Sequence, residues 1–248
     1  MNFSAIAINI SGGLLASIDW RVPFFVFLVA LVLVPMGARS LPEPVVTAEA
    51  KAAVRLKFRE WPLAFIGLVY LMLFLVNIAF FFVPTQVPFY VRELGYDGAQ
   101  IGGFALASSS LGIALGSLLY HPIRSRVRQA ASTFVPAAFL VVVGFGIVSM
   151  GETLTVVMPG LLLAGLGFGV INVNGIVWAM EGTPTNIRGR VVGGLTASMM
   201  LGHFCSPLVS QPIAQAWGLS FVFVFGVGLL GVIGVVFAAN ALRPRSAA

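Results

Sequence analysis

The chain has 248 residues, of which 59% are hydrophobic and only 9% are charged, and its formal net charge is +6. Soluble domains are about 45–50% apolar and about 25% charged, so this composition excludes a water-soluble fold and indicates an integral membrane protein. The 14 Lys and Arg residues are spread between apolar runs and form no basic face for nucleic acid, and the single cysteine excludes an internal disulfide and a cysteine metal cluster.

Continuous apolar runs, bounded by charged residues, Pro or Gly, predict about eight membrane-spanning helices. Roughly 20 apolar residues in a helix cross a bilayer core about 30 Å thick, which leaves no room for a large soluble domain. The alternating polarity that a β-barrel needs is missing. The predicted fold is therefore all-α, a polytopic membrane helix bundle, with spans at about 1–17, 22–38, 62–91, 100–120, 132–150, 153–180, 190–215 and 219–240.

The order of these spans predicts three parts. Residues 1–39 contain two helices, residues 40–61 have the composition of a polar linker, and residues 62–248 form a complete six-helix bundle. A hairpin at 12–27 is loosely repeated at 210–223, with small residues, a Trp turn and a Phe and Val-rich span in each. An offset of six helices indicates a repeat of six spans, so we expect a chain truncated by four helices; two unrelated apolar hairpins are the alternative.

The basic residues predict the orientation. When alternate loops are pooled, 12 of the 14 Lys and Arg residues fall on one side, and only Arg21 and Arg92 fall on the other. By the positive-inside rule, the loops at 39–61, 121–131 and 181–190 and the C-terminus are cytoplasmic. We therefore expect a multi-pass protein of the cell membrane, either an inner or a plasma membrane, with the lipid bilayer as a partner.

Two stretches resemble a known family. Residues 181–194, Glu-Gly-Thr-Pro-Thr-Asn-Ile-Arg-Gly-Arg-Val-Val-Gly-Gly, resemble the loop between the tenth and eleventh helices of major facilitator superfamily transporters. Gly12-Gly13 and the following Trp20-Arg21 resemble the end of that family's fifth helix and its turn into the sixth. The resemblance covers the whole chain as helices five to twelve of twelve. It is closest to the drug and metabolite efflux group.

This sequence departs from the family pattern at two places. Ile8-Asn9 replaces the Gly-Pro of the efflux group's antiporter motif, and Tyr120 and His121 stand where the family usually has an acid and an Arg. The second departure puts the gating salt bridge expected there in doubt.

Polar side chains within the spans indicate which helices face water, because such groups are costly in lipid. The spans at 22–38, 132–150 and 219–240 have almost none, whereas four other helices carry amides, hydroxyls and one imidazole. In the resembled fold, helices seven, eight, ten and eleven line the central cavity, which is the same four. The predicted substrate-cavity residues are Tyr70, Asn77, Gln86, Ser109, Asn172, Asn174, His203 and Gln211.

Each candidate also has a structural interpretation. Asn77 and Gln86 are nine residues apart, about 180° on a straight helix, so only a distortion at Pro84 and Pro88 would turn both toward one cavity. Asn172 and Asn174 point about 200° apart, so at most one faces a substrate squarely. Serines 108–110 are more typical of helix packing.

His203 is the ionisable side chain deepest within a span. It would carry a coupling proton, or it is a neutral histidine satisfied by a carbonyl.

The predicted cytoplasmic gate combines basic residues from two loops with one acid: Arg124, Arg126, Arg128, Glu181, Arg188 and Arg190. No catalytic residue, metal site or cofactor is expected, because Walker A, HExxH and clustered metal ligands are missing from the sequence. Gly165-Leu-Gly-Phe-Gly169 loosely matches a dinucleotide motif, but its place within a span favours close helix packing.

These patterns predict a secondary active transporter, and not an enzyme, that exports small amphipathic molecules by alternating access. The resemblance implies a proton as the coupling ion. The alternative is a non-transporting membrane subunit, or an inactive transporter fragment, that packs against a partner.

Overall fold

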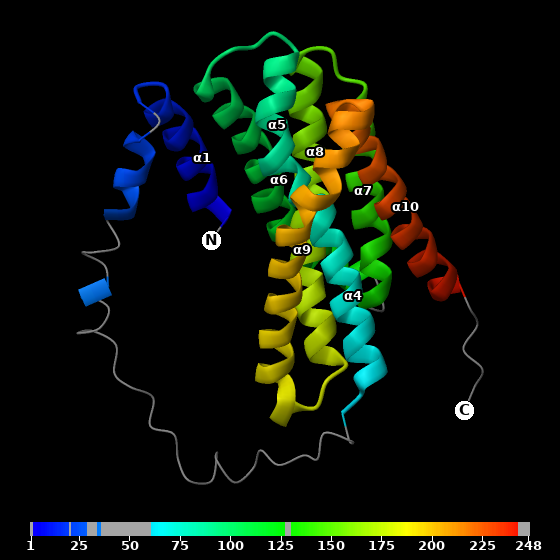
Figure 1. Ribbon diagram of the computed structural model, residues 1–248. Helices are drawn as coiled ribbons and strands as arrows, with labels where there is room; N and C mark the ends of the chain where they lie inside the picture. Colours follow the sequence, from blue (N-terminus) through cyan, green and yellow to red (C-terminus); the bar gives the residue numbers. More distant parts are fainter. Residues whose placement is uncertain (1, 20, 29–33, 36–60, 127–129, 243–248) are drawn as a thin grey trace.

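The computed structural model describes residues 2–19, 21–28, 34–35, 61–126 and 130–242 (Figure 1). Within these residues the secondary structure is helical, without a strand, which confirms the all-α prediction. The elements are α1 (Asn2–Ala16), η1 (Val22–Phe27), α4 (Leu63–Phe80), α5 (Phe82–Glu93), α6 (Ala99–Arg126), α7 (Ala130–Ser149), α8 (Leu154–Glu181), η3 (Thr185–Ile187), α9 (Arg188–Trp217) and α10 (Leu219–Leu242).

Six spans in the described residues are long and apolar enough to cross a membrane, with α4 and α5 forming one of them, Leu63–Glu93. These six correspond to the predicted C-terminal bundle. The first predicted span is a shorter apolar helix, α1. The second, 22–38, begins as a 3₁₀ helix, η1, and about half of it lies outside the described residues. The linker at 40–61 lies outside them except for Trp61, so the three-part division stays a prediction.

The span at 63–93 is interrupted at Phe81, between α4 and α5. Pro84 explains the position, because a proline has no N–H for the carbonyl four residues earlier, which here is that of Phe80. The Phe81 carbonyl accepts both the Thr85 N–H, at 3.3 Å, and the Thr85 hydroxyl, at 2.7 Å, so helical hydrogen bonding resumes directly after the interruption. A distortion was expected at the prolines, and it falls one turn before the first of them.

Helix α8 lies at the centre of the bundle and packs on α6 and α7 through glycines (Figure 1). A Cβ atom on Gly112 of α6 would overlap the Leu162 carbonyl oxygen and lie 3.0 Å from the Gly165 Cα. One turn further along, a Cβ atom on Gly169 would overlap the Ile113 carbonyl oxygen. Two backbones in contact require residues without side chains, so the predicted packing role of Gly165–Gly169 is confirmed.

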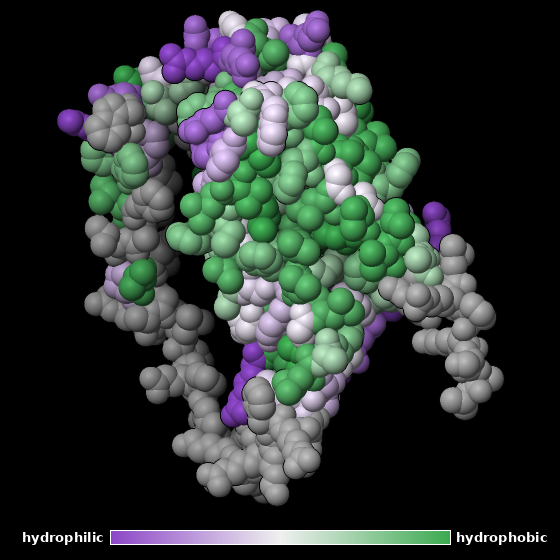
Figure 2. Space-filling view, turned by 45° about the vertical axis from the view of Figure 1, so that its right-hand side comes forward, coloured by the Kyte–Doolittle hydropathy of each residue, from purple (hydrophilic) through white to green (hydrophobic). Residues whose placement is uncertain are grey.

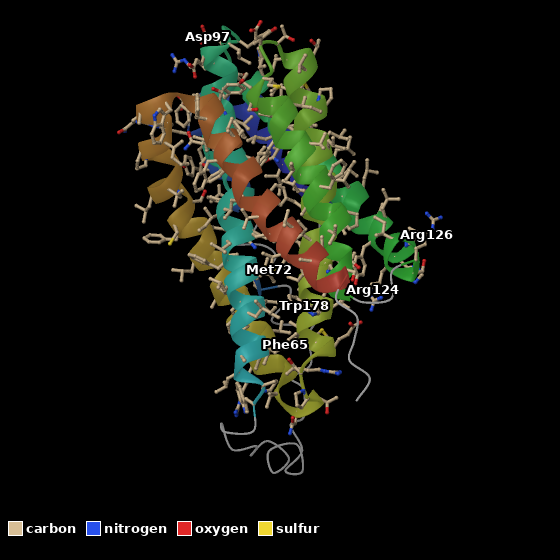
Figure 3. All side chains as sticks on the ribbon, turned by 90° about the vertical axis from the view of Figure 1, so that its right-hand side faces the viewer. Phe65, Met72, Asp97, Arg124, Arg126 and Trp178 are labelled. Atoms are coloured by element: carbon tan, nitrogen blue, oxygen red, sulfur yellow. The ribbon has the colours of Figure 1, made fainter. Side chains whose placement is uncertain are left out.

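The two ends of the bundle differ in charge. Figure 3 places Asp97 at one end and Arg124, Arg126, Phe65 and Trp178 away from it. Between the ends, a broad apolar surface faces outward (Figure 2), as expected for contact with lipid. We call the end that carries the arginines of α6 and α9 the basic end.

Candidate functional site

A partly open pocket of about 290 Å³ lies where α1, α4, α5, α6 and α8 meet. We call it the central pocket. Its walls are mostly apolar, and two of the predicted cavity residues, Ser109 and Asn172, line it. Among the described residues, the lining consists of Asn9, Phe80, Val83, Pro84, Leu106, Ser109, Ser110, Ile113 and Asn172.

Two amides define the polar part of the central pocket. The Asn9 side-chain Nδ2 donates to the Ser110 hydroxyl at 2.8 Å, which joins α1 to α6. The Asn172 Oδ1 is buried and has no hydrogen-bond partner within the described residues. An unpaired buried carbonyl oxygen costs about 1–3 kcal/mol, so a ligand that brings an N–H or O–H donor would recover this energy on binding.

Sequence reasoning missed Asn9 and Ser110 as pocket residues. Asn9 stood out only as a departure from the antiporter motif, although it is an amide in the middle of an apolar helix, which is a signal for a cavity or an interhelical bond. The serine triplet divides between the two expected roles. Ser108 donates to the Met158 carbonyl at 2.7 Å, as packing predicts, whereas Ser109 and Ser110 reach the pocket.

A second buried polar row runs between α9 and the α4–α5 span, and we call it the α9 seam. The His203 Nε2 lies 2.9 Å from the Asn77 Oδ1, and the Gln86 Nε2 donates to the Ser210 hydroxyl at 2.8 Å. Asn77 and Gln86 therefore both point to α9, because the interruption at Phe81 changes the rotation between them. The Gln86 Oε1 and the Ser206 hydroxyl are buried in this seam without a partner in the described part of the chain.

Two more predicted cavity residues serve helix packing in the structure. The Tyr70 hydroxyl donates to the Val191 carbonyl at 2.8 Å and joins α4 to α9. Asn174 is fully buried; its Nδ2 donates to the Ala130 carbonyl at 2.8 Å, and its Oδ1 accepts from the Tyr120 hydroxyl at 3.3 Å. Gln211 lies on an exposed face of α9. None of these three lines the central pocket.

Among the predicted gate residues that the structure describes, Arg124 and Glu181 form an ion pair between helices. Arg124 of α6 lies 3.1 Å from Glu181 of α8, and the Arg188 Nε donates to the Thr183 carbonyl at 3.1 Å. Arg126 and Arg190 are exposed, and Arg128 lies outside the described residues. With side chains 25% and 49% exposed, the Arg124–Glu181 pair contributes about 0.2–1 kcal/mol. It joins α6 to α8, as does the hydrogen bond from the Tyr120 hydroxyl to Asn174.

Comparison with known proteins decides the family. Residues 1–207 match the model of the Major Facilitator Superfamily. The chain belongs to this superfamily of membrane transporters. It is also similar to the multidrug efflux protein YfmO of Bacillus subtilis (strain 168), with 24% identity over 239 residues that cover 92% of this chain and 56% of YfmO. The chain spans about half the length of that relative.

Superfamily membership indicates what kind of protein contains the central pocket and the α9 seam. It makes the chain a multi-pass membrane protein and implies a small-molecule substrate. Under the helix correspondence expected from the sequence, the central pocket lies among the superfamily's helices five, seven, eight and ten, and the α9 seam joins helices seven and eleven.

Proposed function

We propose that the chain works in secondary active export of small amphipathic molecules, driven by a proton gradient through alternating access. The observation that carries this proposal is the central pocket, whose lining combines Phe, Val, Leu and Ile side chains with two amides and two hydroxyls. Its volume, about 290 Å³, lies just below the range of about 300–1,000 Å³ for ligand pockets. The multidrug efflux protein YfmO, to which the chain is similar, supports the direction of transport.

The lining of the central pocket indicates the chemistry of the substrate. The described residues that line the pocket include no Asp, Glu, Lys or Arg, so they offer no side chain to pair with a full charge. An apolar body would fit against Phe80 and Leu106, and one N–H or O–H group would reach the Asn172 Oδ1. We therefore infer a substrate whose part in this pocket is uncharged.

The crossing of α1 and α6 suits a rocking motion. A Cβ atom on Gly13 of α1 would lie 3.0 Å from the Gly103 Cα of α6, so the two backbones touch with no side chain between them. Such a contact allows one helix group to turn against another around a fixed site, as alternating access requires. The positive-inside rule orients the basic end toward the cytoplasm in this proposal.

His203 is the proposed carrier of the coupling proton. The Asn77 Nδ2 donates to the Leu73 carbonyl at 2.8 Å, which leaves the Asn77 Oδ1 as the acceptor facing the His203 Nε2. His203 therefore carries its proton on Nε2 when neutral, and the second proton would be added at Nδ1. The Phe81 ring is stacked on the imidazole at a centroid distance of 4.6 Å and would stabilise the added charge.

His203 has no charged neighbour at its depth in the described helices. The Asp, Glu, Lys and Arg residues of α4, α5, α8, α9 and α10 lie at helix ends, and the printed contacts of His203 are with Asn77, Phe80 and Phe81. Among the described helices around it, the His203 imidazole is therefore the titratable group at this depth.

Replacing His203 by Gln is expected to remove proton coupling and preserve the fold. A Gln amide N–H can replace the Nε2–H donor to Asn77, but it does not titrate between pH 5 and 8. We expect transport driven by a pH gradient to fall at least about tenfold. A gradient of one pH unit is worth about a factor of ten for a protein that carries one proton, and the variant would no longer use it. Substrate exchange without a gradient should persist. An unchanged pH dependence in His203→Gln vesicles would remove His203 from the coupling step.

Reconstitution of the full chain in proteoliposomes tests the proposed function. With a pH gradient imposed, we expect a small fluorescent amphipathic compound to move across the membrane faster than in protein-free vesicles. Folding of the reconstituted chain is checked by its helical circular dichroism.

The second candidate, a subunit that packs against a partner, is favoured by the apolar outer face of α9, where Phe204 is 70% exposed and Leu208 is 65% exposed. A folded chain that neither transports the compound nor binds it would support this candidate and contradict the first.

A further inference from the structure

A shallow apolar groove of about 260 Å³ runs between α7 and α10, on the side of the bundle away from α1 (Figure 1). Its lining contains only Ala, Gly, Val, Leu and Phe residues. We call it the α7–α10 groove. It shares no residue with the central pocket or the α9 seam.

Small residues form the floor of the groove, and large ones form its rims. A Cβ atom on Gly234 would lie 3.4 Å from the Ala138 Cβ, so the two helices approach closely there, whereas a Cβ atom on Gly231 would meet no atom within 4 Å. On the rims, the side chains of Phe139 and Val235 are 65% and 69% exposed. The space over Gly231 is therefore left open between two projecting rims.

The depth of the groove places it in one leaflet. Its α7 residues, Val135 to Val142, lie five to twelve positions after the helix starts at Ala130, which is about 8–18 Å along the axis. Its α10 residues lie within a similar distance of the end of that helix at Leu242. Half of a bilayer core is about 15 Å thick, so the groove faces the acyl chains of the leaflet at the basic end.

Arg126 brings a cationic side chain to the end of the bundle where α7 begins. The rings of Phe134 and Phe237 pack at 5.0 Å, which shows that the start of α7 lies against the end of α10. Arg126, the last residue of α6, precedes Ala130 by four positions, so their Cα atoms are at most about 15 Å apart. Arg126, labelled in Figure 3, is exposed, and within the described residues no ion pair of it is found.

We propose that the α7–α10 groove binds one acyl chain of an anionic phospholipid, whose phosphate pairs with Arg126. An acyl chain suits the purely apolar lining and the open floor at Gly231, since a recess of this kind loses dispersion contacts when nothing fills it. The anionic headgroup suits the cation at the leaflet surface. The lipid is a bound structural partner of the bundle and is distinct from the transported molecule.

Native mass spectrometry of the full chain in detergent tests this proposal, with phosphatidylglycerol and phosphatidylcholine of identical acyl chains as the two probes. The wild-type chain is expected to retain one phosphatidylglycerol more strongly than phosphatidylcholine, by about fivefold for one arginine at the surface. Arg126→Gln should remove this preference and leave phosphatidylcholine retention unchanged. Equal retention of both lipids by the wild-type chain would overturn the headgroup assignment.

A pair of glycine variants tests the groove itself. Gly231→Leu places a side chain in the open floor and should reduce retention of both lipids at least about fivefold. Gly228→Leu is the matched control, because a Cβ atom there also meets nothing within 4 Å and the residue lies outside the groove on the same helix. Equal lipid retention by the two variants would overturn the proposal. It would also be overturned if the wild-type chain and Gly228→Leu showed the mass of a dimer and Gly231→Leu did not, because a second copy of the chain would then fill the groove.

Discussion

Replacing Gly112 and Gly165 together by alanine is expected to destabilise the bundle by about 3 kcal/mol or more, because overpacking costs roughly 1–3 kcal/mol at a single close contact. Each new methyl would overlap a backbone carbonyl oxygen, that of Leu162 for the first position and that of Ser109 for the second. A backbone atom in the middle of a helix cannot rotate away as a side chain does. The helices α6 and α8 would therefore have to separate along their length.

Unfolding in increasing denaturing detergent, followed by circular dichroism, measures this effect. Gly67→Ala combined with Gly146→Ala is the control, since Cβ atoms at both positions meet nothing within 4 Å. Alanine is the better helix former by about 1 kcal/mol, so the control should be as stable as the wild-type chain or slightly more stable. Equal stability of the two double variants would mean that α6 and α8 do not touch through these glycines.

Replacing Asn172 by Leu is expected to reduce transport about tenfold or more and to leave stability intact. The Asn172 Oδ1 has no protein partner in the described residues, so its removal breaks no hydrogen bond that holds the fold. The same change removes the hydrogen-bond acceptor for a bound substrate. The loss of this bond is worth about 1–3 kcal/mol of binding free energy, which is a factor of roughly 5 to 150 in affinity. Initial transport rates in proteoliposomes measure the loss.

Gln211→Leu is the matched control for Asn172→Leu. It also removes one amide from a spanning helix, but Gln211 is exposed and lies outside the central pocket. Transport by this variant should equal that of the wild-type chain. If the two variants lost transport equally, the central pocket would not be the place where the substrate binds.

The sequence predicted the fold well because hydropathy and glycine spacing act locally. Runs of apolar residues fixed the six long spans, and Gly165 and Gly169 marked a close helix contact that the structure confirms. The segregation of polar side chains anticipated that α7 and α10 would contribute no residue to the central pocket, but it also predicted that α9 would line the cavity, and no described α9 residue lines this pocket. These patterns can be read from the sequence without knowing which helices are neighbours.

The candidate site was harder to predict, because a buried amide looks the same in the sequence whether it faces a pocket or another helix. Asn172 and Asn174 illustrate this: the first lines the central pocket, and the second bonds to Ala130 and Tyr120. Asn77 and Gln86 turn toward one helix only because the span bends at Phe81, and a sequence gives no bend angle. Asn9 gains its role from Ser110, which is 101 residues away.

The interruption at Phe81 has a mechanical consequence. The two pieces of the span are attached to different neighbours, α4 mainly to α9 and α5 mainly to α6. Since the prolines at 84 and 88 have already removed two backbone donors, flexing at this joint breaks few intact bonds. In the proposed alternating access, a bend at this joint would let α5 move with α6 relative to α4, and it would have to break the Gln86–Ser210 hydrogen bond that ties α5 to α9.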